Sequence, residues 1–205
     1  MPFDPNYSDN AAFSFDVEGA KKVLDDAGWK VSTDGIREKD GQKLSTAATY
    51  FGDDTTIAAF TQSFQAQMKA IGVEVAIDSQ PVAAFADYMG QKKFSTAYSG
   101  NGVGADATSG LAQLFNSQNP GNATGAGTAQ IDELIKQVPA IADKEARMAA
   151  ANEVEKEFSK LYAILPVYNG PNIFAVKKGL ANWGPELFAL RGWTVVGWEK
   201  GSARN

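Results

Sequence analysis

The sequence predicts an α/β fold built around parallel strands, because strand-like and helix-like segments alternate between residues 44 and 98. Apolar and polar residues alternate over 44–51 and 73–77, which is the period of a strand, and a third strand is expected over 94–98. The segments between them repeat apolar residues at three- and four-residue steps, which is the period of a helix. A strand-helix-strand-helix-strand order of these lengths is typical of parallel strands joined by crossover helices. We therefore expect a βαβαβ mixed sheet flanked by helices.

The segment before this sheet predicts a short helix followed by a hairpin. Asp16 is a good N-cap, and Gly28 supplies the left-handed position that often ends a helix. Asp40 and Gly41 form a turn pair between two short strand-like segments. These residues are expected to be scaffold and not ligand contacts.

Two helices are expected between the strands. The first opens at Asp53 and Asp54, runs to about Ala70 and is closed by Gly72. Its expected apolar face consists of Ile57, Phe60, Phe64, Met68 and Ile71. The second is shorter and ends near Gly90. Its apolar residues are Val82, Phe85 and Met89.

The second half of the chain predicts loops and helices, then two strands. A glycine-rich loop over 99–110 and a polar loop over 116–127 flank a brief helix at 111–115. One helix follows up to Pro139, and a longer one is expected over 144–162. The residues expected to face inward on the longer helix are Ala146, Ala150, Val154, Phe158 and Leu161. Strands are expected over 165–169 and 173–177.

Composition excludes several kinds of chemistry. The 205 residues contain no Cys and no His, so disulfides, thiolate metal sites, Cys nucleophiles and Ser-His-Asp triads are ruled out. A net charge of −5 argues against nucleic acid as a partner. No apolar run approaches the length of a membrane span, about 18 residues. We expect no catalytic residue, no metal and no cofactor.

Several short motifs occur in an order that resembles one protein family. The first runs from an acidic residue through Ala-Lys, Leu and Ala-Gly-Trp to Asp-Gly-Ile-Arg, Gly and Leu. In this chain these positions are Asp16, Ala20-Lys21, Leu24, Ala27-Gly28-Trp29, Asp34-Gly35-Ile36-Arg37, Gly41 and Leu44. The segments 67–73 and 164–168 continue the pattern. Together they resemble the family 5 extracellular solute-binding proteins, the dipeptide and oligopeptide receptors of ABC importers.

The resemblance implies a fold, a division of the chain and a set of partners. The fold would be one lobe of a periplasmic-binding-protein-like fold of type II, cluster C. Residues 1–15 would be irregular, 16–181 would form the C-terminal lobe, and 182–205 would return to a first lobe. Family members are more than twice as long, so we expect a C-terminal fragment of a periplasmic protein or cell-surface lipoprotein. Its partners would be a peptide or related small solute, the permease and ATPase of the importer, and the N-terminal lobe.

The glycine-rich loop is the expected ligand site. It follows the third strand, where ligands of open α/β sheets bind, and its glycines let a ligand backbone approach closely. The family places a Gly-Trp-x-x-Asp motif here, whose Asp pairs with the ligand's α-ammonium group. Gly100 fits the glycine, Asn101 replaces the tryptophan, Gly104 falls at the aspartate, and Asp106 is the candidate anchor. The expected ligand contacts are Tyr98, Gly100, Asn101, Gly102, Val103, Asp106, Tyr168 and Asn169.

Plainer interpretations of these residues remain open. The loop could be a solvent-facing connector, Asp106 an N-cap, and Tyr168 a buried core residue. Gly100-x-Gly102-x-x-Ala105 also formally fits a dinucleotide-binding fingerprint, although no acidic strand end follows about 20 residues later.

Three function classes therefore stand at this point. The first is the substrate-binding component of an ABC importer, which binds peptides in an interlobe cleft and delivers them to a permease. The second is an α/β hydrolase-like or nucleotide-using enzyme domain. The third is a non-transport surface protein with the same fold.

Overall fold

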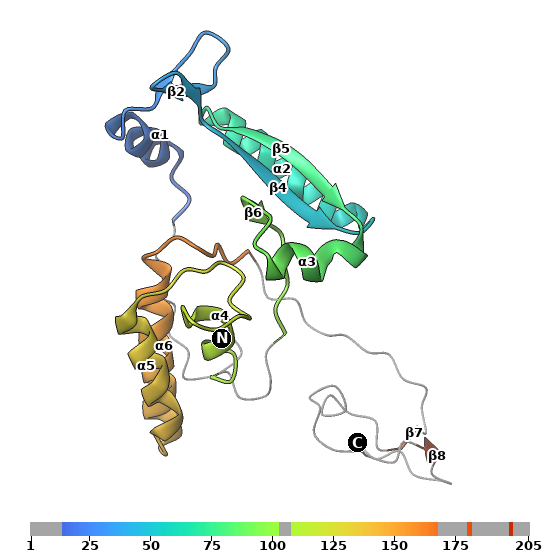
Figure 1. Cartoon of the computed structure of the whole chain (residues 1–205), viewed down its shortest axis with the longest axis vertical. Coiled ribbons are helices and arrows are strands. Elements are labelled where there is room, and N and C mark those ends of the chain that lie inside the picture. The colour runs from blue at the N-terminus through green and yellow to red at the C-terminus, as the bar shows by residue number, and fades with distance from the viewer. Residues whose placement is uncertain (1–13, 103–107, 168–179, 182–196, 199–205) are drawn as a thin grey trace.

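The computed structural model describes residues 14–102, 108–167, 180–181 and 197–198, and Figure 1 shows their arrangement. Expected features at other positions lie outside the described residues. None of the helices in the described ranges has both the length and the apolar composition that a membrane span requires.

A three-stranded parallel sheet forms the centre of the first half of the chain. Its strands are β4 (Ser45–Phe51), β5 (Glu74–Gln80) and β6 (Thr96–Ala97), in the spatial order β5-β4-β6. Both β5 and β6 pair with β4 in parallel. The predicted α/β class with parallel strands is thus confirmed. The third strand is shorter than the predicted 94–98.

Helices connect these strands as the sequence predicts. α2 (Thr55–Ala70) joins β4 to β5 and contacts both strands (Figure 1). The short 3₁₀ helix η1 (Val82–Ala84) and α3 (Phe85–Gly90) join β5 to β6. Asp54 caps α2 by accepting hydrogen bonds from the backbone of Thr56 and Ile57, at 2.7 and 3.4 Å.

On α2, the neighbouring residue Thr61 takes the buried position that was predicted for Phe60. Thr61 is buried, and its hydroxyl donates to the Ile57 carbonyl at 2.8 Å. Phe60, one position earlier, is 36% exposed. The prediction that Phe60 faces the core is therefore wrong. The hydroxyl of Thr61 can be buried because it is hydrogen-bonded within its own helix.

The N-terminal segment forms its own small unit. α1 (Val17–Asp26) precedes an antiparallel sheet of β1 (Lys30–Val31), β2 (Arg37–Lys39) and β3 (Gln42–Lys43). Among the described residues, the parallel and antiparallel pairings thus lie in separate sheets.

The two predicted ends of α1 and the predicted turn of the hairpin are confirmed. Asp16 caps α1 by accepting from the Gly19 backbone at 2.8 Å. Gly28 has a φ of +90°, and its amide and that of Trp29 donate to the last turn of the helix, which is a Schellman motif. Asp40 and Gly41 both have positive φ, as a type I′ turn requires.

The helices α4 (Leu111–Phe115), α5 (Ala129–Gln137) and α6 (Lys144–Ser159) pack against one another below the sheet in Figure 1. A 3₁₀ helix, η2 (Val138–Ala140), follows α5. Their shared core consists of Leu111, Ile131, Ile135, Val138, Met148, Ala151, Val154 and Phe158.

The inward face of α6 differs from the prediction at both ends. Val154 and Phe158 are buried as expected, but Ala146 and Leu161 are exposed and Met148 and Ala151 are buried instead. The helix ends at Ser159, so Leu161 lies beyond its last turn.

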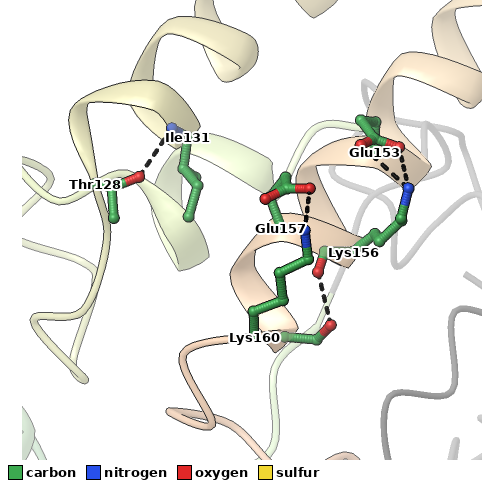
Figure 2. A network of polar contacts seen from close by, with 7 residues as sticks. Thr128, Ile131, Glu153, Lys156, Glu157 and Lys160 are labelled. Carbon is green, nitrogen blue, oxygen red and sulfur yellow. Dashed lines mark hydrogen bonds and ion pairs between the residues drawn. The ribbon is translucent and has the colours of Figure 1, made fainter.

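The outer surface of α6 carries ion pairs at three-residue spacing (Figure 2). Lys156 pairs with Glu153 at 3.1 Å, and Lys160 pairs with Glu157 at 2.5 Å. Such pairs stabilise a helix by only about 0.2–0.5 kcal/mol each. The ion pairs on this side of α6 therefore contribute little to the stability of the helix.

The polar loop between α4 and α5 is organised around one buried side chain. Asn122 is 1% exposed, and its amide nitrogen donates to the carbonyls of Asn116 and Ala126 at 3.1 and 2.7 Å. Its amide oxygen accepts from the hydroxyl and backbone of Thr124 and from the Gly125 backbone. Both polar atoms of Asn122 are therefore satisfied inside the loop.

The end of the chain is described only in short pieces. β7 (Leu180–Ala181) and β8 (Gly197–Trp198) form an antiparallel pair. Residues 165–167 are not in a strand, so the start of the predicted strand over 165–169 is wrong. The rest of that strand and the one over 173–177 lie outside the described residues. The domain boundaries at residues 15 and 181 stay predictions.

Candidate functional site

The carboxyl ends of the three parallel strands meet at one edge of the sheet. β4 ends at Phe51, β5 ends at Gln80, and the chain leaves β6 through Tyr98. The Tyr98 amide donates to the Thr49 carbonyl at 2.8 Å, which anchors the start of the following loop to β4. Because ligands of open α/β sheets bind at this edge, it is the candidate site.

The described start of the glycine loop is open to its surroundings. Gly100, Asn101 and Gly102 are exposed, and a Cβ placed on either glycine would meet nothing within 4 Å. Neither glycine has the positive φ that other residues avoid. Within the described part of the chain, neither backbone conformation nor a neighbouring atom requires glycine at these two positions.

Tyr98 lies between the sheet and α2. Its ring centroid is 5.3 Å from that of Phe60, with the two rings tilted by 55°. Tyr98 is half-buried and not fully enclosed, so the structure leaves part of it at the surface. The sequence analysis included Tyr98 in the site, but it assigned Phe60 to the core of the domain.

The opposite face of the sheet carries a second aromatic group at the same edge. The ring of Phe51 contacts Phe85 and Tyr88 edge-on, at 5.1 and 5.8 Å between centroids. Phe85 and Tyr88 both come from α3. The contacts place α3 against the end of β4, and Phe85 remains 40% exposed.

A polar cluster on the sheet was missed by the sequence analysis. Asp78 accepts from the buried Thr49 hydroxyl at 3.0 Å and from the Gln80 side chain at 2.5 Å. Parallel register places Thr49 directly beside Asp78, so the two side chains share one face. The signal in the sequence was an acidic residue within an otherwise alternating strand. Both carboxylate oxygens are hydrogen-bonded, so the cluster is satisfied internally.

The ionisable groups with shifted pKa values lie away from this edge. The Arg37 guanidinium beside Asp25 lowers the pKa of that carboxyl group below its ordinary value of 3.8. Hydrogen bonds from Lys43, Ser32 and the Ile36 backbone lower the pKa of Asp34 well below its ordinary range. In turn, Asp34 raises the pKa of Lys43 above 10.5.

A fourth shift occurs on α6, where the ammonium group of Lys160 lowers the pKa of the Glu157 carboxyl group below 4.5. In all four groups the largest cause of the shift is a hydrogen bond to an oppositely charged side chain. Within the described residues, no three His, Cys, Asp or Glu side chains gather in a group that could hold a metal ion.

The predicted site residues divide into two groups. Tyr98, Gly100, Asn101 and Gly102 lie together at the carboxyl edge of β6, as expected from their position after the strand. The other four lie outside the described residues, and their roles stay predictions: Val103, Asp106, Tyr168 and Asn169.

An open parallel α/β sheet with an exposed glycine loop at its carboxyl edge is an architecture in which ligands commonly bind at that edge. The comparisons specify the class further. The family model for bacterial extracellular solute-binding proteins, family 5, middle region, matches residues 1–123, and the chain belongs to this family.

Two curated relatives show the extent of the similarity. The oligopeptide-binding protein OppA of Mycobacterium tuberculosis strain H37Rv is 31% identical over 193 residues, covering 93% of this chain and 32% of the relative. Protein XP55 of Streptomyces lividans is 27% identical over 157 residues, covering 75% of this chain and 28% of the relative. The chain thus spans about a third of the length of the curated relatives it matches.

Solved structures agree on the fold. The oligopeptide-binding protein of Thermus thermophilus, complexed with a pentapeptide, has a TM-score of 0.73 at 21% identity, over 89% of this chain and 34% of that one. NikA of Brucella suis, in complex with Fe(III)-EDTA, has a TM-score of 0.63 at 25% identity, over 78% of this chain and 34% of that one. The predicted periplasmic-binding-protein-like fold is confirmed.

Proposed function

We propose that this chain is the C-terminal lobe of the substrate-binding component of an ABC importer. In this role it binds a peptide, or a related small solute, in a cleft between two lobes and delivers it to a membrane permease. Family membership supports the general role.

The observation that carries the proposal is the open glycine loop at the carboxyl edge of the sheet. Gly100 and Gly102 are exposed, and nothing in the described part of the chain requires glycine there. Close approach of a ligand main chain would explain the two glycines, since a side chain at either position would clash with that main chain. Main-chain hydrogen bonds would let the site bind extended peptides with many different side chains.

The relatives support peptides as the ligand class, but their names do not indicate a particular peptide sequence or length. Several are named oligopeptide-binding proteins, and two of the similar structures contain a pentapeptide and a nonapeptide. Others with the same fold contain Fe(III)-EDTA or Ni(L-His). The fold therefore accommodates other small solutes, and the peptide assignment depends on the named relatives.

The remaining contacts of the proposed site are assigned by the family resemblance. Asp106 would pair with the ligand's α-ammonium group, in a charge-assisted bond of about 2.7–2.9 Å. Val103, in the same loop, would also contact the ligand. Tyr168 and Asn169, which follow α6 in the sequence, would contact it as well. Asn101 stands where the family has tryptophan, so this chain lacks the aromatic ring of the family's motif at this position.

The mechanism would be hinge closure of two lobes around the solute, with no chemical step. The closed form would dock on the permease at the outer face of the cytoplasmic membrane, either in the periplasm or as a cell-surface lipoprotein. The extracellular name of the family supports this location. The ATPase subunit would then drive release and transport.

An enzyme domain is the less favoured function. The family consists of solute-binding proteins. A hydrolase would place two carboxylates, or another acid and base, across a cleft. At the described carboxyl edge, Asp78 has both oxygens bonded to neighbours and Asp54 caps α2.

Calorimetric titration tests the proposed function. A library of short peptides is titrated into this chain and into the full-length receptor that contains it. We expect measurable binding to the full-length receptor and a much weaker affinity for the lobe alone, because half of the contacts are absent. Equal affinity for both proteins contradicts the two-lobe mechanism.

The anchor role of Asp106 has its own test. Asp106→Asn in the full-length receptor is expected to weaken peptides with a free N-terminus and to leave N-acetylated peptides unchanged. An equal effect on both peptide forms contradicts the anchor role.

A further inference from the structure

We infer that Phe60 and Tyr98 form an aromatic subsite that selects for an apolar, preferably aromatic, side chain of the bound peptide. The inference is based on the proposed function, since it assigns a specificity to the same carboxyl edge of the sheet. It does not depend on Asp106 or on any other residue outside the described part of the chain.

The two rings reach this edge from different elements. Tyr98 follows β6 and immediately precedes the open glycine loop. Phe60 lies in the second turn of α2, which begins at the carboxyl edge because it follows the end of β4. Their centroids are 5.3 Å apart, which is within the range of a stabilising aromatic pair.

The position of Phe60 on α2 leaves part of its ring exposed, so that a ligand could contact it. The inward position of this turn is occupied by Thr61, which is only 3% exposed. Phe60 lies about 100° around the helix from Thr61, at the border between the sheet and the surface. A phenylalanine that is 36% exposed gives up part of the free energy that full burial would supply.

A ligand side chain would complete the burial of this pair. Gly100 is two residues beyond Tyr98, and the space around it is empty within 4 Å of a Cβ position. Side chains of an extended peptide point alternately to opposite faces. A main chain bound along Gly100 to Gly102 would therefore direct every second side chain toward α2, where the pair lies. One or two peptide positions should then be sensitive to Phe60.

The chemistry of the subsite is apolar and aromatic. Phe60 and Tyr98 can add a third ring in tilted or edge-on geometry, as Phe51 does with Phe85 on the other face. An aromatic side chain gains such a contact in addition to the area that it buries. A glutamate side chain gains neither contribution and would lose part of its hydration.

A double-mutant cycle with the ligand tests the inference in the full-length receptor. The probes are penta-alanine and the five peptides in which one alanine is replaced by phenylalanine, all titrated by calorimetry. The variants are Phe60→Leu, which removes the ring, and Phe60→Tyr, which retains it. We expect one or two peptide positions at which phenylalanine strengthens binding, and Phe60→Leu should reduce that gain by about threefold to tenfold.

Phe64→Leu is the matched control, because it is the same change one turn farther along α2 from the carboxyl edge. It should leave the gain intact, and Phe60→Tyr should retain most of it. The gain is measured within each variant as the ratio of its affinities for the substituted peptide and for penta-alanine, so a general loss of affinity in Phe60→Leu cancels. A thermal melt of each variant supports that comparison.

Each result decides between the inference and the proposed function. If penta-alanine and the substituted peptides bind but no position is coupled to Phe60, the subsite is overturned and the proposed function stands. The subsite is also overturned if Phe64→Leu reduces the gain as much as Phe60→Leu does. If no peptide binds the wild-type receptor, the peptide assignment fails and the subsite fails with it.

Discussion

Replacing Arg37 tests how the N-terminal hairpin is joined to the parallel sheet. The Arg37 side chain is 3% exposed, although it carries a permanent charge. Its Nε donates to the Ile71 carbonyl at the end of α2, at 2.8 Å. One terminal nitrogen donates to the Trp29 carbonyl and to the Asp25 carboxylate, both at 2.7 Å. One side chain therefore connects the ends of two helices.

The magnitude follows from these contacts. Arg37→Met removes two hydrogen bonds from a charged donor to backbone carbonyls, each contributing about 1.5–3 kcal/mol. Removing the buried charge recovers part of its desolvation cost, and a methionine can fill most of the space. The ion pair with Asp25 adds little, because that carboxylate is half-exposed. We expect a net loss of about 2–4 kcal/mol in the free energy of unfolding.

Urea denaturation followed by circular dichroism measures this loss, and the melting temperature should fall by about 5–15 °C. Arg37→Lys should show an intermediate loss, because an ammonium group keeps the charge but cannot span the same three acceptors. Lys39→Met is the matched control. Lys39 also donates to a carbonyl at the end of α1, that of Ala27 at 2.9 Å, but it lies at the surface.

The control should lose less than about 1 kcal/mol. If Arg37→Met destabilises the chain no more than Lys39→Met, the reasoning is refuted. The hairpin would then be attached to the sheet by its backbone pairing and not by this buried side chain. The Arg37 amide does bond to the Gly72 carbonyl at 2.8 Å, which any residue but proline would retain.

Three further predictions concern other parts of the chain. Asn122→Ala should destabilise the loop between α4 and α5 by about 2–4 kcal/mol, because it removes several buried hydrogen bonds; hydrogen exchange of the loop amides measures this. Phe158→Ala should cost about 3–5 kcal/mol in thermal unfolding, because Phe158 lies in the helical core. Leu161→Ala, at a position that is 38% exposed, should cost far less, and equal losses would contradict the corrected inward face of α6. The lowered pKa of Asp34 means that its contribution is present above its ordinary pKa of 3.8 and is lost as the pH falls below it. Asp34→Asn should therefore flatten the acid side of a plot of urea midpoint against pH, and an unchanged slope would show that other carboxylates produce it.

Much of the local structure could be predicted from the sequence. Asp16, Gly28 and the Asp40-Gly41 pair act through contacts within a few residues of themselves, so their roles are visible in the sequence. The order of strands and helices was predictable for a similar reason, because period and capping are local properties. The family was also recognisable, since the spacing of short motifs is preserved along the chain.

The candidate site was only partly predictable. The position of Tyr98 and the glycine loop follows from the end of β6. The role of Phe60 did not follow, because hydrophobic periodicity defines a broad stripe on a helix and does not say which residue at its border is buried. Asp78 was missed because its partner Thr49 is distant in sequence and adjacent only through parallel pairing.

The sequence alone determined the caps of α1, the Asp40-Gly41 turn, the order of strands and helices from β4 to β6, and the family to which the chain belongs, because these signals lie in residues close together along the chain. Only the tertiary structure decided which borderline side chains are buried and which distant residues meet. It brings Arg37 to the end of α2, and it brings Phe60 beside Tyr98, 38 positions later. Such contacts depend on how packed surfaces fit against each other, and no local pattern encodes that fit.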